Sequence, residues 1–327
     1  MILRRLLLRS GAVWLGLGPL PQLVQAQERR RISILHSGFP NRTPIHLLFE
    51  ALQALGFEDG RTATVELLGG EGDPERLKSL IAQLTSQKPD VIIALTPPAA
   101  LGLKQAGTTI PVVFAFVPDP VGSGLVNSLA HPGGNFTGVT YSDPKLGGKR
   151  LEILLDAVPG VKRVAVIGGV GSTDNGGPPM VHSIESTAAT HGIKIYARRV
   201  AGLEDLDTAF ADAEREGSQA VVFLSTNLLF GHRKKIAELE LSHHLPAIHS
   251  FPPEVTDGSL MSYGPNLQET LERVAALTER ILKGSHPADL PVEEPTKFTL
   301  IINMKTAKSL GLTLSPLILA RVDEVIE

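Results

Sequence analysis

The sequence predicts an α/β protein of two Rossmann-like lobes, each a layer of parallel strands covered by helices. From residue 31 onward, short apolar runs alternate with amphipathic segments, and alternation with helices of about 10–15 residues is typical of right-handed βαβ units. The alternation breaks once, in a stretch rich in Gly and Pro at residues 131–143, and then begins again. The length of 327 residues also suits two domains.

Composition narrows the functional class. The chain is 43% hydrophobic and 20% charged, as in an ordinary soluble protein, and its formal charge is −3. No cluster of Lys and Arg forms a basic surface, and no helix-turn-helix precedes the first apolar run, so a nucleic-acid partner is not expected.

Residues 1–26 are typical of a secretory signal peptide. Arg4, Arg5 and Arg9 precede a short apolar stretch, and small residues lead up to a cleavage site near Ala26. The pair Arg4-Arg5 leaves twin-arginine export open, and a buried N-terminal helix is the alternative interpretation. Cleavage near Ala26 would remove three arginines and no acidic residue, which would change the formal charge from −3 to −6. The chain has no cysteine to form a disulfide or carry a lipid, which predicts a soluble periplasmic protein.

The elements of the first series follow from apolar periodicity. Strands are expected at residues 32–38, 62–70, 89–96 and 110–119, and helices at residues 43–57, 73–87, 97–106 and 120–130. Asp73 followed by Pro74 is a typical N-cap and first helical position. Gly122 and Gly124 after the fourth strand are expected to allow a tight turn at the start of the last of these helices.

The second series repeats this pattern. Helices are expected at residues 144–160, 178–192, 203–217 and 228–244, and strands at residues 162–169, 193–200, 219–226 and 245–251.

The last segment passes between the lobes again. It reads as a strand at residues 258–266, a long helix at 267–284, a Pro-rich linker, and a final strand and helix at 298–312. With crossings near Tyr263 and within residues 287–295, the N-terminal lobe comprises residues 27–138 and 263–288, and the C-terminal lobe residues 139–262 and 289–327. Three crossings between two lobes predict a hinge for a cleft that opens and closes.

Motifs for nucleotide, metal and hydrolytic chemistry are missing from the sequence. No Lys follows Gly124 as a phosphate-binding P-loop requires, and Asn127 stands where a dinucleotide fingerprint has its third Gly. There is neither a G-x-S-x-G nor an H-E-x-x-H motif. We therefore expect no catalytic set, no metal site and no cofactor.

The residues at the carboxyl ends of the strands favour a binding site instead, because ligands of open α/β sheets bind there. The candidates in the first lobe are Ser37, Gly38, Thr96, Pro97, Phe116 and Asp119. Those in the second lobe are Ser172, Asp174, Asn175, Ser225, Thr226, Asn227 and Ser250. Such a set suits a small polar or zwitterionic ligand, with Asp119 or Asp174 meeting an ammonium and helix-start N–H groups meeting a carboxylate. The alternative for each polar residue is a helix N-cap.

Four stretches resemble the ABC-transporter substrate-binding proteins of the tryptophan/tyrosine type. They are FVPDPVGSGLVNSLAHPGGNFTGVT at residues 116–140, KRLEILLDAVPGVKRVAV at 149–166, GSLMSYGPN at 258–266 and the run from Pro295 to Glu327. The resemblance covers the chain from about Arg31 to Glu327. It implies a type I periplasmic-binding fold with a three-crossover hinge, one ligand enclosed between the lobes, and delivery to an inner-membrane permease. Members with a known preference bind aromatic amino acids.

The sequence therefore predicts a monomeric periplasmic solute-binding protein for an ABC importer, with an amino-acid-like ligand and no catalysis. A sensory module that reports ligand occupancy to a membrane receptor is the alternative, and cross-linking to either membrane partner separates the two. A periplasmic hydrolase is the third hypothesis, which turnover of a bound ligand would support.

Overall fold

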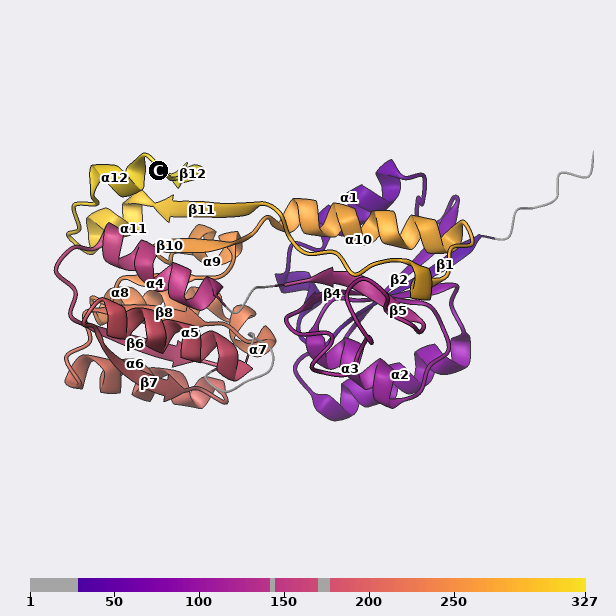
Figure 1. Ribbon diagram of the computed structural model, residues 1–327, viewed down its shortest axis with the longest axis horizontal. Helices are drawn as coiled ribbons and strands as arrows, with labels where there is room; N and C mark the ends of the chain where they lie inside the picture. Colours follow the sequence, from indigo (N-terminus) through magenta and orange to yellow (C-terminus); the bar gives the residue numbers. More distant parts are fainter. Residues whose placement is uncertain (1–28, 142–144, 170–176) are drawn as a thin grey trace, which may run out of the picture.

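Two lobes lie side by side, each built around its own sheet (Figure 1). The structure is a computed structural model that describes residues 29–141, 145–169 and 177–327. Helices cover sheets whose strands are mostly parallel, so the prediction of a two-lobed α/β fold is confirmed.

The first sheet has the strand order β2-β1-β3-β4-β5, and all of its pairs are parallel. Its strands are β1 (Arg30–His36), β2 (Ala63–Gly69), β3 (Val91–Ala94), β4 (Val112–Val117) and β5 (Phe136–Thr140). The central strands are apolar and buried on both faces, as helices on both sides of a parallel sheet require.

Each face of the first sheet has its own helical layer. Helices α2 (Pro74–Gln87) and α3 (Pro97–Gln105) pack on one face. Helix α1 (His46–Ala54) and α10 (Leu267–Leu282) cover the other face, where α10 also contacts α1. Apolar residues of α10 recur every three or four positions, and this stripe is its buried face. The first lobe is therefore completed by a helix from late in the sequence.

The second sheet has the order β12-β11-β10-β9-β8-β6-β7. Its strands are β6 (Arg163–Gly168), β7 (Lys194–Arg199), β8 (Ala220–Leu224), β9 (Ala247–His249), β10 (Met261–Pro265), β11 (Phe298–Asn303) and β12 (Glu324–Ile326). Helices α4 (Leu146–Ala157) and α5 (Gly177–Thr190) contribute to the core on one face, together with α11 (Met304–Ser309) and α12 (Pro316–Leu319). Helices α6 (Leu206–Arg215) and α8 (Arg233–Ser242) cover the other face. The short helices α7 (Asn227–Phe230) and α9 (Pro252–Thr256) follow β8 and β9.

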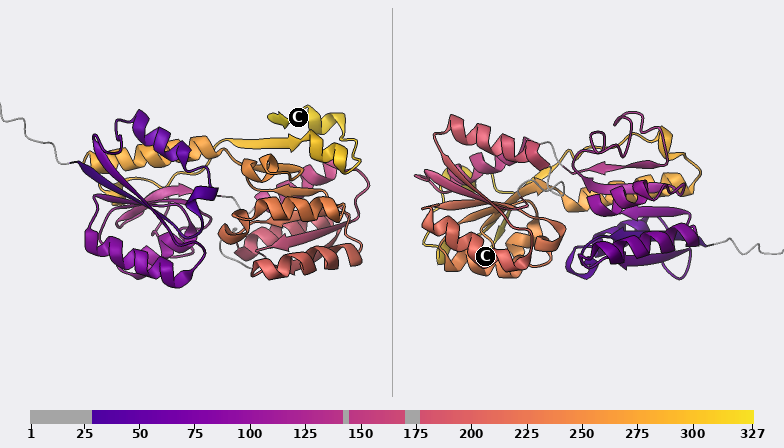
Figure 2. Two further views of the ribbon diagram at one scale, coloured as in Figure 1. Left: turned by 180° about the vertical axis from the view of Figure 1, so that it is seen from behind. Right: turned by 90° about the horizontal axis from the view of Figure 1, so that it is seen from below.

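The chain crosses between the sheets three times (Figure 2). It leaves the first sheet after β5, leaves the second after β10 to form α10, and returns through the 3₁₀ turn at Pro287–Asp289 to β11. This return segment still touches the first lobe, because Thr137 Oγ1 donates to the carbonyl of Leu290 at 2.7 Å. Strands β10 and β11 lie antiparallel, as expected for a chain that runs out to one lobe and back.

Local capping explains where several helices begin. The Asp73 side chain accepts hydrogen bonds from the backbone N–H groups of Glu75 and Arg76, so the predicted N-cap is confirmed. Asn266 caps α10 in the same way, through the N–H of Glu269. Both caps satisfy donors that have no partner within their own helix.

Three sequence predictions of secondary structure were wrong. Residues 120–130 form turns and no helix, with Gly124 in the left-handed region at φ +71°; the Pro and Gly content there disfavours a helix. Strand β5 lies inside the stretch at residues 131–143 that we read only as a boundary. The helix expected at residues 228–244 is two helices, α7 and α8, separated at Gly231 and His232; glycine weakens a helix at this point.

Candidate functional site

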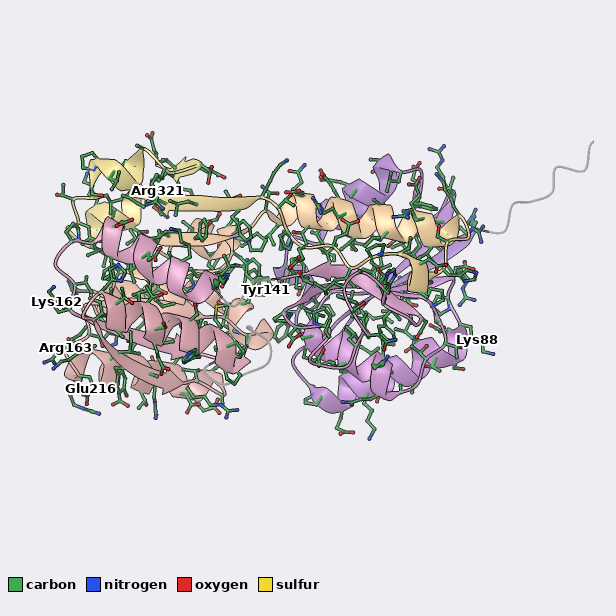
Figure 3. The ribbon with its side chains drawn as sticks, in the orientation of Figure 1. Lys88, Tyr141, Lys162, Arg163, Glu216 and Arg321 are labelled. Atoms are coloured by element: carbon green, nitrogen blue, oxygen red, sulfur yellow. The ribbon has the colours of Figure 1, made fainter. Side chains whose placement is uncertain are left out.

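A cleft lies between the lobes, where side chains from both sheets meet. It encloses ≈ 740 Å³ together with the space at its mouth. The lining residues of the first lobe and of helix α10 are His36, Thr43, Pro44, Ile45, Leu95, Pro97, Phe116, Leu267 and Leu271. Those of the second lobe are Ser225, Thr226, Phe230 and Phe251, and Tyr141 lies on the first crossing between the lobes (Figure 3). The lining is mostly apolar and aromatic, with four small polar groups and Tyr141.

The topology explains why these residues meet. His36 ends β1, Leu95 follows β3, and Phe116 lies at the end of β4. Ser225 follows β8 and Phe251 follows β9. The carboxyl ends of parallel strands meet at one edge of a sheet, and the two lobes turn these edges toward each other.

Four aromatic rings form a cluster centred on Phe251. The Phe251 ring centroid lies 5.2 Å from that of Tyr141, 5.7 Å from Phe230 and 6.1 Å from Phe116. The contacts with Phe230 and Phe116 are edge to face, a favourable geometry for aromatic rings. Since Phe116 belongs to the first lobe and Phe251 to the second, the cluster joins the lobes across the cleft.

The backbone of Phe116 has an uncommon conformation. Its φ is +60°, in the left-handed region that bulky residues rarely adopt, and the pairing of β4 with β5 shifts register between Ala115 and Val117. Such a conformation costs of order 1–3 kcal/mol and persists only where the surroundings hold it. Here the irregularity accompanies a ring that lines the cleft.

His36 lines the cleft with a neutral imidazole. Its side chain is buried, and its Nδ1 accepts from the backbone N–H of Gly38 at 2.9 Å. Burial lowers the pKa of His36 to about 4, so the ring is neutral at neutral pH. A neutral imidazole that accepts at Nδ1 carries its hydrogen on Nε2.

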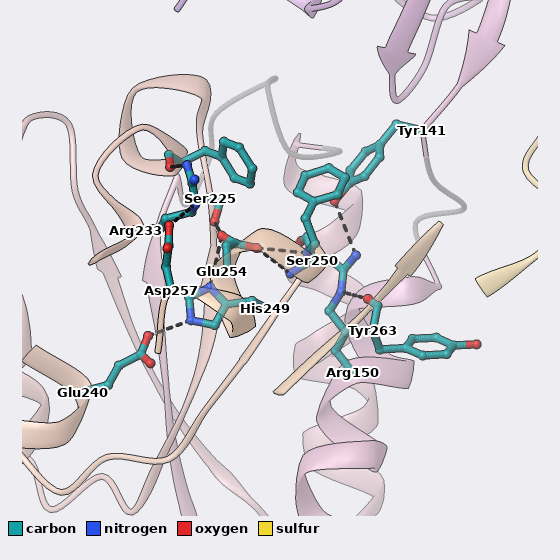
Figure 4. A network of polar contacts seen from close by, with 12 residues as sticks. Tyr141, Arg150, Ser225, Arg233, Glu240, His249, Ser250, Glu254, Asp257 and Tyr263 are labelled. Carbon is teal, nitrogen blue, oxygen red and sulfur yellow. Dashed lines mark hydrogen bonds and ion pairs between the residues drawn. The ribbon is translucent and has the colours of Figure 1, made fainter. Parts of the chain in front are cut away.

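Behind the second-lobe wall lies a chain of buried polar groups (Figure 4). The Ser225 hydroxyl donates to Glu254 Oε1, and the same carboxylate lies 3.1 Å from His249 Nδ1. His249 Nε2 lies 2.6 Å from Glu240 Oε1. Burial alone would lower the pKa of His249, yet the charges and hydrogen bonds of Glu240 and Glu254 raise it to about 10. The imidazole is therefore a cation between two carboxylates.

Arg150 is a second buried cation near the cleft, with no exposed surface. Its Nε donates to the backbone oxygen of Tyr263 at 2.8 Å and its Nη2 to the Tyr141 hydroxyl at 3.4 Å (Figure 4). Within the described residues it forms no ion pair with a carboxylate. It thus contacts Tyr141 on the first crossing and the strand β10 that leads into the second crossing.

The family model for ABC transporter substrate binding proteins matches residues 44–326. The chain belongs to this family. The substrate-binding protein is similar to the tyrosine-binding protein of Clostridioides difficile (strain R20291), with 26% identity over 264 residues that cover 80% of this chain and 75% of that protein.

Solved structures show the same architecture. A conserved domain protein of Vibrio cholerae O1 biovar El Tor is 25% identical with a TM-score of 0.84, and the match covers 91% of this chain and all of that one. An ABC domain from Streptococcus pneumoniae in complex with L-tryptophan is 24% identical with a TM-score of 0.81, at the same coverage. The type I periplasmic-binding fold implied by the sequence is confirmed. No helix in the described part of the substrate-binding protein is long and apolar enough to span a membrane.

Four of the predicted site residues line the cleft: Pro97, Phe116, Ser225 and Thr226. Ser37, Gly38 and Thr96 are buried beneath it. The N–H of Ser37 donates to Thr96 Oγ1 at 3.2 Å, and that of Gly38 holds His36, so these three residues position the lining.

The remaining candidates lie elsewhere. Ser250 is fully buried, and its N–H donates to Glu254. Asp119 is exposed, does not line the cleft, and accepts from the N–H of Gly122 at 2.7 Å. Asn227 begins α7, but its side chain is outside the description. Ser172, Asp174 and Asn175 lie outside the described residues.

The sequence pattern did not indicate most of the apolar lining of this substrate-binding protein. Tyr141 follows strand β5, and this position was the available signal. Thr43, Pro44 and Ile45 precede α1, while Leu267 and Leu271 belong to α10, so no strand end marks them. The site is consequently more apolar than the predicted set.

Proposed function

We propose that this chain is a periplasmic solute-binding protein that captures an amino-acid-like ligand with an aromatic side chain between its lobes. Membership of the family makes it the substrate-binding component of an ABC transporter. The observation that carries the proposal is the cleft itself, whose walls are aromatic and aliphatic with a few convergent polar groups. Such a lining suits a small ligand with one flat apolar part and one polar end.

The ligands of two similar proteins support a ligand with an aromatic side chain. One is a tyrosine-binding protein and the other was solved with L-tryptophan. In this chain the rings of Phe116, Tyr141, Phe230 and Phe251 are the groups that would contact a flat ligand. An aromatic pair contributes about 0.5–1.5 kcal/mol beyond its buried area.

Binding without chemistry is part of the proposal. A hydrolase would need a nucleophile activated by a general base. The Glu254 carboxylate that accepts from the Ser225 hydroxyl also contacts the charged His249. Burial alone would raise the pKa of Glu254, but His249 helps to hold it below its usual range and so makes Glu254 a weak base. Closure would be a motion of the two lobes about their three crossings, stabilised by a ligand that touches both. The predicted signal peptide supports export of a monomer to the periplasm, where an inner-membrane permease would take the ligand.

A ligand screen by calorimetry and thermal shift tests the proposal. The panel would contain L-tryptophan, L-tyrosine, L-phenylalanine, L-leucine, L-glutamate and D-ribose, applied to protein refolded to remove co-purified ligand. A ligand at about 100 times its Kd stabilises the folded protein by about 2.7 kcal/mol, which raises Tm by a few degrees. Selective stabilisation by aromatic amino acids supports the proposal. Stabilisation by ribose alone, or release of a chemically altered ligand, contradicts it.

A further inference from the structure

The third crossing between the lobes is fixed at both of its ends. Glu293 pairs with β5 of the first sheet: its N–H donates to the carbonyl of Gly138 at 2.9 Å, and its carbonyl accepts from the N–H of Thr140 at 2.8 Å. Phe298 begins β11 of the second sheet and pairs with β10. Residues 294–297 therefore span the two lobes, and short connecting segments of this kind absorb a change in the angle between lobes.

Side chains of helix α10 hold this span from the first lobe. Arg273 Nη2 lies 3.0 Å from Glu269 Oε1, one helical turn away, and Arg273 Nη1 lies 3.1 Å from Glu293 Oε2. The hydroxyl of Thr296 donates to Glu269 Oε1 at 2.9 Å and accepts from Arg273 Nη2 at 3.1 Å. A hydroxyl can do both because it carries one hydrogen and two lone pairs. We call Glu269, Arg273, Glu293 and Thr296 the hinge clasp.

The hinge clasp and the cleft wall share one helix. Leu267 and Leu271 of α10 line the cleft, whereas the four clasp residues do not. The second crossing enters the same helix at Asn266, whose N–H donates to the carbonyl of Lys297 in the third crossing at 3.0 Å. Figure 1 shows these two crossings side by side between the lobes. A movement of the third crossing relative to α10 is therefore also a movement relative to the wall of the cleft.

The clasp is formed in an arrangement in which the lobes touch across the cleft. The ring centroid of Phe116 lies 6.1 Å from that of Phe251, and the rings of Phe39 and His232 form a second contact at 5.9 Å. Each pair joins a residue of the first lobe to a residue of the second. The contacts between Thr296 and α10 thus belong to a closed arrangement of the lobes.

We propose that the hinge clasp stabilises the closed arrangement and so slows release of the ligand without contacting it. Opening of the cleft rotates the lobes about residues 294–297 and draws Thr296 away from α10, so these contacts contribute to the closed state alone. The inference rests on the proposed function, because the clasp acts on a ligand held between the lobes. The side chains of Glu269, Arg273 and Glu293 are 19%, 29% and 33% exposed, and water screens their ion pairs. The effect on the release rate is therefore moderate.

Substitution of Thr296 tests the clasp with little change to the fold. Thr296→Val keeps the shape of the side chain and removes the hydroxyl, so both contacts with α10 are lost. Thr296→Ser keeps the hydroxyl and should restore the behaviour of the wild type. Arg273→Gln removes the donors at the centre of the network. Lys283→Gln is its matched control, because Lys283 forms an ion pair with Glu279 on the same helix at 2.7 Å, where it is 70% exposed.

The arrangement of the lobes can be measured directly. The chain has no cysteine, so Ser79→Cys on α2 and Ser186→Cys on α5 attach one spin label to each lobe at exposed positions. Pulsed electron paramagnetic resonance gives the distances between the labels with and without L-tryptophan. Stopped-flow fluorescence gives the rate at which L-tryptophan dissociates. Thermal unfolding of each variant shows that the comparison is made on folded protein.

The two variants that break the clasp should release L-tryptophan faster. For Thr296→Val and Arg273→Gln we expect an increase of about threefold or more, because a hydrogen bond or a partly exposed ion pair contributes a modest net free energy. The label distances of the closed arrangement should be less populated in both variants. Thr296→Ser and Lys283→Gln should stay within about twofold of the wild-type rate.

Each outcome gives a decision. Faster release with fewer closed molecules in Thr296→Val, restored in Thr296→Ser, supports the inference. A Thr296→Val protein with the wild-type distances overturns it, whatever its release rate, and the proposed function would stand. A wild type that binds no aromatic amino acid contradicts the proposed function, and the ligand-free distances then test the clasp alone. A shifted or broader distribution in Thr296→Val supports the clasp in that case, and an unchanged distribution overturns it.

Discussion

The Nε of Arg150 donates to the backbone oxygen of Tyr263 over 2.8 Å, from helix α4 to the strand that leads out of the second sheet. The same guanidinium reaches the hydroxyl of Tyr141 on the first crossing. A buried cation thus contacts the first connection between the lobes and the strand that leads into the second connection. This arrangement fixes where the connections lie relative to α4, and so contributes to the position of the cleft wall that Tyr141 forms.

Loss of the Arg150 side chain should destabilise the fold. Arg150→Met keeps much of the volume but leaves the buried oxygen of Tyr263 without its donor, which costs about 1–3 kcal/mol. Tyr141→Phe removes only the hydroxyl contact and should cost about 1 kcal/mol or less. Urea unfolding of both variants measures the difference. Equal stability of Arg150→Met and wild type would show that the contact does not contribute.

The ring of Phe251 should contribute to ligand affinity through the aromatic cluster. Phe251→Leu removes edge-to-face contacts with Phe116 and Phe230, and we expect about 10-fold weaker binding of L-tryptophan. Titration calorimetry measures this loss. Phe57→Leu is the control, because Phe57 packs on the first-lobe core and does not line the cleft. Equal effects of both substitutions would contradict a direct contact.

Asp119 should affect stability more than binding. Its carboxylate accepts from the N–H of Gly122 at 2.7 Å in the turn after β4. Asp119→Ala should lower the free energy of unfolding by about 0.5–1.5 kcal/mol and leave the Kd for L-tryptophan within about twofold, or about 0.4 kcal/mol. Calorimetry and urea unfolding on the same sample measure both. A 10-fold increase in Kd would instead indicate that Asp119 contributes to ligand binding.

The buried imidazolium predicts a loss of stability at high pH. The unfolded chain releases the His249 proton near the usual pKa of about 6.5, whereas the folded protein holds it to about 10. The contribution of His249 is therefore complete below about pH 6.5 and is lost as the pH rises toward 10. Urea unfolding of wild type and His249→Gln from pH 6 to 10 should show a stability difference that shrinks with pH. A constant difference would mean that His249 is neutral in the fold.

The sequence predicted most strands because their apolar runs are long and bounded by turn residues. Strand β5 was not predicted, because Phe136, Thr137 and Val139 stand among Gly, Pro and Asn, a composition typical of turns. Its pairing with β4 in the folded protein determines that this segment is a strand. Helix α10 was predicted from its periodicity, but its packing against α1 depends on contacts distant in sequence. Apolar periodicity predicts that a helix forms, but the surface against which the helix packs depends on contacts with residues distant in sequence.

Local sequence pattern also limited what could be predicted of the candidate site. Phe116 and Ser225 were candidates because each stands next to a strand end, and the topology brings those ends to the cleft. Position along the sequence does not show that the Asp119 carboxylate accepts a hydrogen bond within its own turn. Nor does it show that Glu254 and His249 lie behind Ser225. Their pairing joins residues 24 or more positions from Ser225, which no local pattern reports.

The left-handed backbone of Phe116 has a consequence for engineering. Glycine adopts this conformation without strain, so Phe116→Gly would relieve part of the backbone cost while removing a ring from the cleft. Selection for heat resistance and selection for ligand capture would then favour different residues at one position. A biosensor built on this scaffold should therefore gain its thermal tolerance at sites remote from β4, and keep the phenylalanine.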